Sequence, residues 1–156
     1  MVKLIPTFIA AVMLVIAVPT AQAGTSEIIR LHSSDLLTQG IRALRQGDME
    51  RAITSLERFL KEPASRSNRV AARNNLCIAY EYVGDLDAAY EQCSIAIELN
   101  PKYWRAYNNR GNVHLAGGAY QAASADYQLA LEINPKAKAA RENLKLVEAE
   151  AAKQLR

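Results

Sequence analysis

Two cysteines have the most definite chemistry open to them in this chain. Cys77 and Cys93 are its only cysteines, and they lie almost equally far from the intervening Gly84-Asp85 pair. If the flanking segments form antiparallel helices, the two thiols meet at the same height. A disulfide there would close a loop and add ~3 kcal/mol of stability in the loop-closure model. Two reduced thiols that pack as small apolar side chains are the alternative.

Arg110 and Asp126 are also placed symmetrically about a turn, since each is eight positions from Gly118. The positions 34 residues earlier hold Leu76 and Gln92, so charge occurs at both places together or at neither. We expect a partly buried ion pair, whose disruption would cost ~3–5 kcal/mol if burial is deep. Because no nucleophile or general base accompanies this pair, we interpret it as structural and not catalytic.

Other chemistry is not indicated. His32 and His114 have no companion at metal-ligand spacing, so we expect no metal site, and we interpret His114 as a packing residue. The sequence has no Ser-His-Asp spacing, phosphate-binding glycine loop or paired carboxylates at an expected pocket. Its 19 basic and 16 acidic residues are evenly spread and give a net charge of +3, too weak for a nucleic-acid footprint. We therefore expect no enzymatic activity, no cofactor and no nucleic-acid partner.

The residues above lie in a repeated pattern. Residues 70–103 align without gaps on residues 104–137 with eleven identities, so the period is 34 residues. Gly47 and Ala52 precede Gly84 and Ala89 by 37 residues, which indicates an earlier unit with a three-residue insertion in its exit loop. Such a period predicts stacked units, none of which buries its apolar face alone.

Apolar residues recur at helical spacing within each unit, so the predicted fold is all-α. Glycines mark the turns inside units, and an Asn-Pro pair lies at the end of each of the last two units. We expect an α-solenoid of three helix-turn-helix units, 33–69, 70–103 and 104–137, with a C-terminal capping helix within 136–156. The expected helices before the capping helix are Ser34–Gln46, Met49–Lys61, Asn68–Val83, Leu86–Leu99, Tyr103–Ala116 and Ala119–Ile133, with a loop at Glu62–Asn68.

The units resemble the tetratricopeptide repeat, a 34-residue pair of antiparallel helices. The resemblance covers about 33–137 and is carried by a small eighth residue, a turn glycine, a twentieth-position alanine and a closing proline. These are Gly40, Cys77 and Gly111; Gly47, Gly84 and Gly118; Ala52, Ala89 and Ala123; and Pro101 and Pro135. The first unit departs from the pattern, with Phe59 in place of a small residue and Pro63 one place early.

The resemblance implies a concave groove, lined by the first helix of each unit, that binds a peptide. The implied groove residues are Leu37, Ile41, Arg45, Asn74, Ile78, Tyr82, Arg105, Asn108 and Asn112. Asparagine amides there could bond a peptide backbone. For Asn74 and Asn108, packing between units is an equal alternative, and for Asn75 and Asn109 we favour packing. Leu37 and Ile41 stand where the family's chaperone-tail clamp has a lysine and an asparagine, so we do not expect that clamp to bind an acidic C-terminal tail.

The first 23 residues have the features of a signal peptide. Lys3 precedes the apolar run Leu4–Val18, and Pro19 and Ala21-Gln22-Ala23 come after it. We expect cleavage after Ala23, a lead-in at 24–32, and a mature net charge of +2, since only Lys3 is lost. A retained anchor is the alternative, but the apolar run is shorter than the ~20 residues that span a bilayer. We therefore expect export to the periplasm or outside the cell, without stable membrane insertion after cleavage.

Together these features predict a non-enzymatic scaffold of the cell envelope or secreted space, which binds an unidentified protein or peptide along its groove. The alternative is a self-assembling or membrane-surface structural factor. The sequence does not indicate the oligomeric state.

Overall fold

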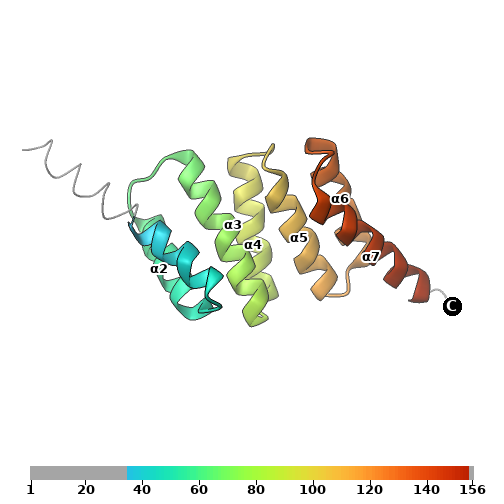
Figure 1. The fold of residues 1–156 in the computed structure, drawn as a ribbon, viewed down its shortest axis with the longest axis horizontal. Coiled ribbons are helices and arrows are strands. Elements are labelled where there is room, and N and C mark those ends of the chain that lie inside the picture. The colour runs from blue at the N-terminus through green and yellow to red at the C-terminus, as the bar shows by residue number, and fades with distance from the viewer. Residues whose placement is uncertain (1–34, 155–156) are drawn as a thin grey trace, which may run out of the picture.

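The computed structural model describes residues 35–154, and every regular element in that part of the chain is a helix. The predicted signal peptide and lead-in lie outside the described residues. A first helix runs through 35–45, and its start is not described. The others are α2 (Met49–Lys61), α3 (Arg66–Val83), α4 (Leu86–Leu99), α5 (Trp104–Ala116), α6 (Tyr120–Ile133) and α7 (Lys138–Gln154) (Figure 1).

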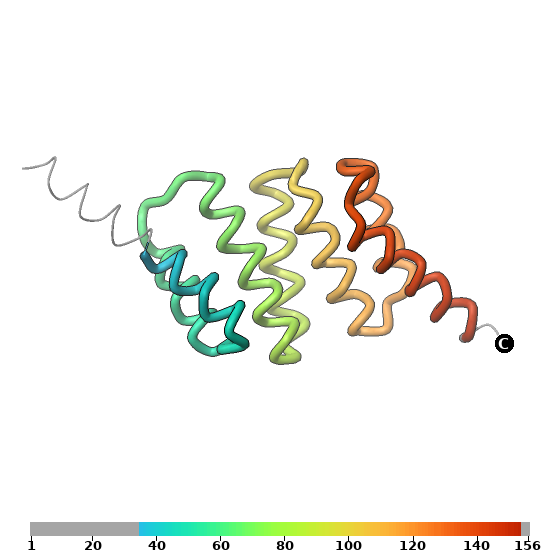
Figure 2. The backbone as a smooth tube through the Cα atoms, in the orientation of Figure 1, coloured from blue at the N-terminus to red at the C-terminus, as the bar shows by residue number. Residues whose placement is uncertain are grey.

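Consecutive helices run antiparallel and form three pairs that stack along one axis, with α7 at the end (Figure 2). The first helices of successive units also pack against one another. α3 contacts α5, and α5 contacts α7. The described chain therefore has two layers: helix 35–45, α3, α5 and α7 form one, and α2, α4 and α6 form the other. This arrangement confirms the predicted all-α solenoid of three units and a capping helix. None of the described helices is long and apolar enough to cross a membrane.

Each turn inside a unit is made by a glycine in the left-handed region. Gly47, Gly84 and Gly118 have φ of 78°, 83° and 74°, a conformation that a side chain would strain. Asp48 and Asp85 then cap the next helix, each accepting a backbone hydrogen bond of 3.1 Å three residues on. The turn inside each unit is thus set by residues of that unit, with a side-chain cap in the first two units.

The predicted loop at Glu62–Asn68 was wrong at its C-terminal end. The loop covers only residues 62–65, because α3 begins at Arg66, where the Ser65 hydroxyl accepts from the Asn68 amide at 3.2 Å. The later connection, residues 100–103, is equally long. The insertion therefore lies in an extra first turn of α3. That turn has a packing role, since the Arg66 Nε donates to the Leu99 carbonyl at the end of α4 at 2.5 Å.

One contact inside each unit recurs with different chemistry. In the first unit a Cβ at Gly40 would lie 2.6 Å from Leu56, and in the third a Cβ at Gly111 would lie 2.6 Å from Tyr127. The corresponding pair in the second unit is Cys77 and Cys93, joined by a disulfide with Cα atoms 5.3 Å apart. All three pairs are 16 residues apart and bring the two helices close together.

The core lies between the layers and continues from unit to unit. Phe59, the residue that departs from the repeat pattern, is 1% exposed and packs with Leu56 and Leu76 at the junction of the first two units. At the other end α7 covers α6 with Val147, which is 1% exposed. Lys145 of α7 occupies the place that Gly111 has in α5, and it is exposed. A further helix that approached α7 as closely as α6 approaches α5 would meet this side chain.

Candidate binding surface

The nine implied groove residues all lie on helix 35–45, α3 and α5, and α7 continues the same layer. We call the outer surface of this layer the first-helix face. Tyr82 is 72% exposed, whereas Asn74 and Asn108 are only 4% and 7% exposed. Arg45 and Arg105 are exposed, and the half-buried members of the set are Leu37, Ile41, Ile78 and Asn112.

Asparagines join the first helices of successive units through side-chain hydrogen bonds. Asn109 of α5 donates to the Asn74 oxygen of α3 at 2.9 Å. One unit on, Asn143 of α7 donates to the Asn108 oxygen at 3.3 Å. A 3.3 Å bond from Asn108 to Asn109 joins these two contacts. We call this set the asparagine ladder, and it fixes the spacing of α3, α5 and α7.

The ladder stops at the first unit for a reason visible in the sequence. Asn75 occupies the place of Asn109 and Asn143, but its partner position one unit earlier holds Leu37. Asn75 instead donates to the Ala71 carbonyl of its own helix at 2.9 Å. The junction between the first two units therefore relies on apolar packing, in which Leu37 takes part.

The ladder limits what the asparagines can offer a ligand. Asn74 and Asn108 are almost inaccessible, and their oxygens already accept bonds within the stack. Asn112 is half-buried, and its oxygen accepts from Asn143 at 3.0 Å and from the Tyr127 hydroxyl at 2.9 Å. Sequence reasoning missed Asn143, although its position 34 residues after Asn109 was a usable signal.

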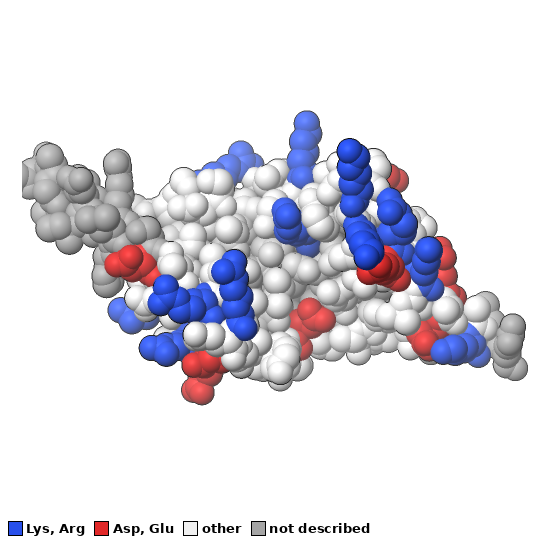
Figure 3. All heavy atoms as spheres, viewed as in Figure 1, with Lys and Arg blue, Asp and Glu red and all other residues white. Residues whose placement is uncertain are grey.

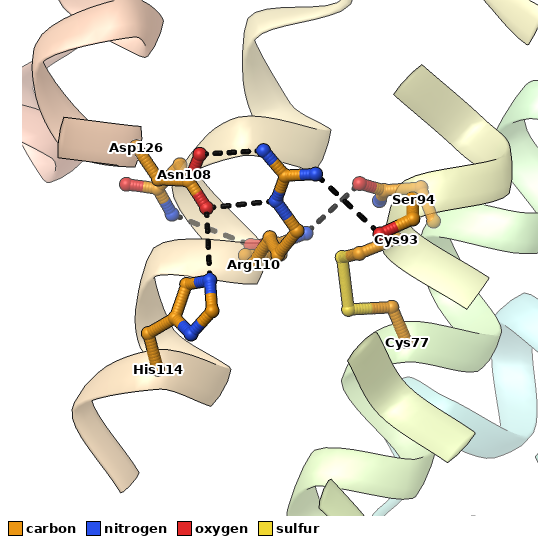
Figure 4. The surroundings of a disulfide bond; sticks show 9 residues. Cys77, Cys93, Ser94, Asn108, Arg110, His114 and Asp126 are labelled. Carbon is orange, nitrogen blue, oxygen red and sulfur yellow. Dashed lines mark hydrogen bonds and ion pairs between the residues drawn. A yellow bond between two sulfur atoms is a disulfide. The ribbon is translucent and has the colours of Figure 1, made fainter. Parts of the chain in front are cut away.

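Arg110 and Asp126 form a two-pronged ion pair between α5 and α6 (Figure 4). The guanidinium Nε and Nη2 donate to the carboxylate at 2.8 and 2.7 Å, and the Asp126 side chain is 5% exposed. The hydrogen bond to Asp126 raises the pKa of Arg110, against the lowering effect of burial. Such two-pronged, charge-assisted geometry holds the two helices together.

The ion pair adjoins the disulfide and two aromatic rings. Arg110 Nη1 donates to the Ser94 hydroxyl at 3.4 Å, and Ser94 follows Cys93 in α4 (Figure 4). His114 lies 3.7 Å from the Asp126 carboxylate and edge-on to Tyr90, with ring centres 5.3 Å apart. In residues 35–154 no group of three or more His, Cys, Asp or Glu is placed to hold a metal.

Glu81 is a residue of the first-helix face that sequence reasoning passed over. It occupies the twelfth place of its unit, one of the places that line the groove in the resembling family, and it is half-buried. Burial raises the pKa of its carboxyl group. Its charge also contributes, after burial, to the raised pKa of Tyr127.

Charge is unevenly distributed on the side of the molecule that Figure 3 shows. Basic atoms gather over α7 and over the end formed by helix 35–45, and a smaller basic group lies between them in the middle of the view (Figure 3). A small acidic patch lies between the lower ends of α3 and α5. The middle of this side therefore carries mostly uncharged atoms together with one small basic and one small acidic group.

Residues 104–137 match the family model of the tetratricopeptide repeat. The human peptidyl-prolyl cis-trans isomerase FKBP4 is 31% identical over 99 residues, which cover 62% of this chain and 22% of that protein. The chain thus spans about a fifth of the length of this relative and of its bovine counterpart.

Two solved structures have the same fold. The first TPR of Spaghetti (RPAP3), bound to the HSP90 peptide SRMEEVD, has a TM-score of 0.71 and 24% identity, with 78% of this chain and 97% of that chain covered. The second TPR domain of human RPAP3, in complex with the HSP70 peptide SGPTIEEVD, has a TM-score of 0.66 and 24% identity, with the same coverage. The described chain therefore has the fold of a three-repeat tetratricopeptide domain.

Proposed function

We propose that this three-repeat tetratricopeptide fold is a non-catalytic scaffold that binds a protein or peptide along its first-helix face. One observation carries the proposal: a face whose spacing is fixed by the asparagine ladder leaves the Tyr82 ring 72% exposed. Exposed aromatic side chains on a preorganised surface are efficient binding contacts, because little conformational entropy is lost when a partner docks. Half-buried Ile78 and Ile41 extend the apolar surface, and Arg45 and Arg105 border it.

The two solved structures named above contain acidic peptides that end in Glu-Glu-Val-Asp. For this chain we propose a different ligand. Leu37 and Ile41 replace the lysine and asparagine of the family's chaperone-tail clamp, and Leu37 is also engaged in the core. We expect no saturable binding of the peptide SRMEEVD by fluorescence anisotropy, and micromolar binding would contradict this part of the proposal.

We further propose that the protein acts outside the cytoplasm, in the periplasm or a secreted space. The support is the sequence of residues 1–23, with its apolar run and the Ala21-Gln22-Ala23 site. The test is fractionation followed by N-terminal sequencing. We expect the protein in the periplasmic or secreted fraction with Gly24 as its first residue; a cytoplasmic protein that begins at Met1 would contradict the proposal.

Affinity capture from an envelope extract tests the binding surface. The variant combines Tyr82→Ala with Arg105→Glu, both at exposed positions of the first-helix face. The matched control combines Leu129→Ala with Arg58→Glu, at exposed positions of α6 and α2 in the other layer. We expect partners captured by the wild type to be lost by the first variant and kept by the control. If the first variant stays helical and captures the same proteins, the site is not on this face.

The second candidate function is self-assembly through the α6–α7 end. A cavity of about 280 Å³ opens there, and Leu146 of α7 is 51% exposed. The cavity is lined by Tyr120, Gln121 and Ser124 of α6 and Val147, Glu148 and Ala151 of α7. Light scattering after size-exclusion chromatography distinguishes the two functions: a monomer at all concentrations excludes self-assembly, and a dimer lost in Leu146→Glu supports it.

A further inference from the structure

The carboxylate of Glu81 has no counter-ion among the residues that the structure describes. It forms no side-chain hydrogen bond or ion pair with any residue of 35–154, although it is half-buried. The most buried carboxylate described, Asp126, is by contrast held by two bonds from Arg110. A carboxylate that loses water without gaining a partner destabilises the fold. The charge of Glu81 therefore has no stabilising role within the stack.

The surroundings of Glu81 are those of a binding surface. Ile78 precedes it by one helical turn and is half-buried, and Tyr82 follows it with its ring exposed. In the neighbouring unit the Tyr127 hydroxyl donates to Asn112 on α5, and the charge of Glu81 contributes, after burial, to the raised pKa of Tyr127. Glu81 thus belongs to α3, which packs against α5 of the third unit, and it lies one residue from the exposed Tyr82.

We infer that Glu81 selects a basic side chain, lysine or arginine, in the ligand of the first-helix face. This inference rests on the proposed function and names the chemistry of its partner. A ligand ammonium or guanidinium would supply a counter-charge, and part of the desolvation of Glu81 has already occurred on folding. The exposed ring of Tyr82 can cover the aliphatic stem of the same side chain or stack on its cation. An acidic ligand group would be repelled at this position.

Peptide selection tests the inference without knowledge of the natural ligand. A phage-displayed library of random twelve-residue peptides is selected on the full chain, on Glu81→Gln and on a matched control, Glu98→Gln, whose carboxylate is exposed on α4. We expect the wild-type and Glu98→Gln pools to be enriched in Lys and Arg over the starting library. The Glu81→Gln pool should lack that enrichment.

A thermodynamic cycle with one selected peptide then isolates the pair. Replacing its conserved basic residue with norleucine should weaken binding to the wild type about tenfold, measured by fluorescence anisotropy. The same replacement should change binding to Glu81→Gln less than about twofold, because the partner charge is absent. Equal basic content in the wild-type and Glu81→Gln pools, or an equal loss of affinity on both proteins, would overturn the inference.

The Tyr82→Ala, Arg105→Glu variant separates the two levels of the proposal. If it loses the selected peptides while Glu81→Gln retains their basic preference, the face binds peptides and only the role of Glu81 is wrong. If it binds the peptides as the wild type does, or if selection on the wild type enriches none, the proposed function fails and the inference fails with it.

Discussion

Reduction of the Cys77–Cys93 disulfide should weaken the second unit by an amount set by the loop it closes. The bonded cysteines are 16 residues apart, and the loop-closure model gives about 3 kcal/mol for a loop of this length. For a folded region of the size of residues 35–154, that loss corresponds to a fall in melting temperature of roughly 10 °C. Because both cysteines are 0% exposed, reduction should require unfolding or prolonged exposure to the reductant.

The assay compares urea unfolding of the full chain, followed by circular dichroism, before and after reduction in denaturant and refolding with reductant. The matched control is Cys77→Gly with Cys93→Leu, which copies the Gly40–Leu56 contact of the first unit. This variant keeps the close helix approach without a cross-link, so reductant should leave its midpoint unchanged. The wild-type midpoint should fall.

Two results would refute this reasoning. Titration of the denatured, unreduced chain that finds two thiols per molecule would show that the bond does not form. A wild-type midpoint unaffected by reduction, with both thiols alkylated to prove that reduction occurred, would show that the bond adds no stability.

Three further predictions concern the polar groups of the stack. Asp126→Asn should lower the unfolding free energy by about 3 kcal/mol, because Arg110 keeps its charge and loses its ionised partner; an unchanged melting temperature would contradict the pairing. Asn109→Ala should cost about 1–2 kcal/mol in urea unfolding, since it leaves the buried Asn74 oxygen without a donor, whereas Asn75→Ala, which loses only a bond within its own helix, should cost less. Glu81→Gln should raise the melting temperature at pH 7, because burial raises the folded-state pKa of the Glu81 carboxyl and its ionised form therefore destabilises the fold. This gain should disappear below about pH 4, where the carboxyl is protonated in both the folded and the unfolded chain; equal melting temperatures of Glu81→Gln and wild type at pH 7 would exclude this cost.

The fold was predictable because the periodicity and the turn residues agree. Gly84 and Asp85 carry the turn signal in adjacent positions, and apolar residues on either side recur at helical spacing. The start of α3 was missed because Ser65 follows Pro63 in a polar stretch typical of a loop, and only the hydrogen bond to Asn68 shows that Ser65 is a cap. The repeat spacing gives the number of inserted residues, but it does not show whether they lengthen a helix or a loop.

The binding surface was predictable only as a set of positions. Asn74 and Asn108 occur at groove places, but their accessibility depends on the bonds from Asn109 and Asn143, which come from other units. Glu81 was passed over for the opposite reason. A single glutamate on an amphipathic helix belongs to no recognisable sequence motif. Whether it has an ion-pair partner can be judged only from the three-dimensional structure, which includes the neighbouring unit.

Lys145 of α7 bears on how closely an added helix could pack against the last helix. If copies of the second or third unit were fused after α7, the next helix would pack poorly on α7. The cationic side chain of Lys145 stands at the place where the two helix backbones would come closest. Exchange of Lys145 for glycine would remove that obstacle and turn the last helix into an acceptor for a designed partner. The side chain at this one position thus influences how closely a further unit could be packed onto the stack.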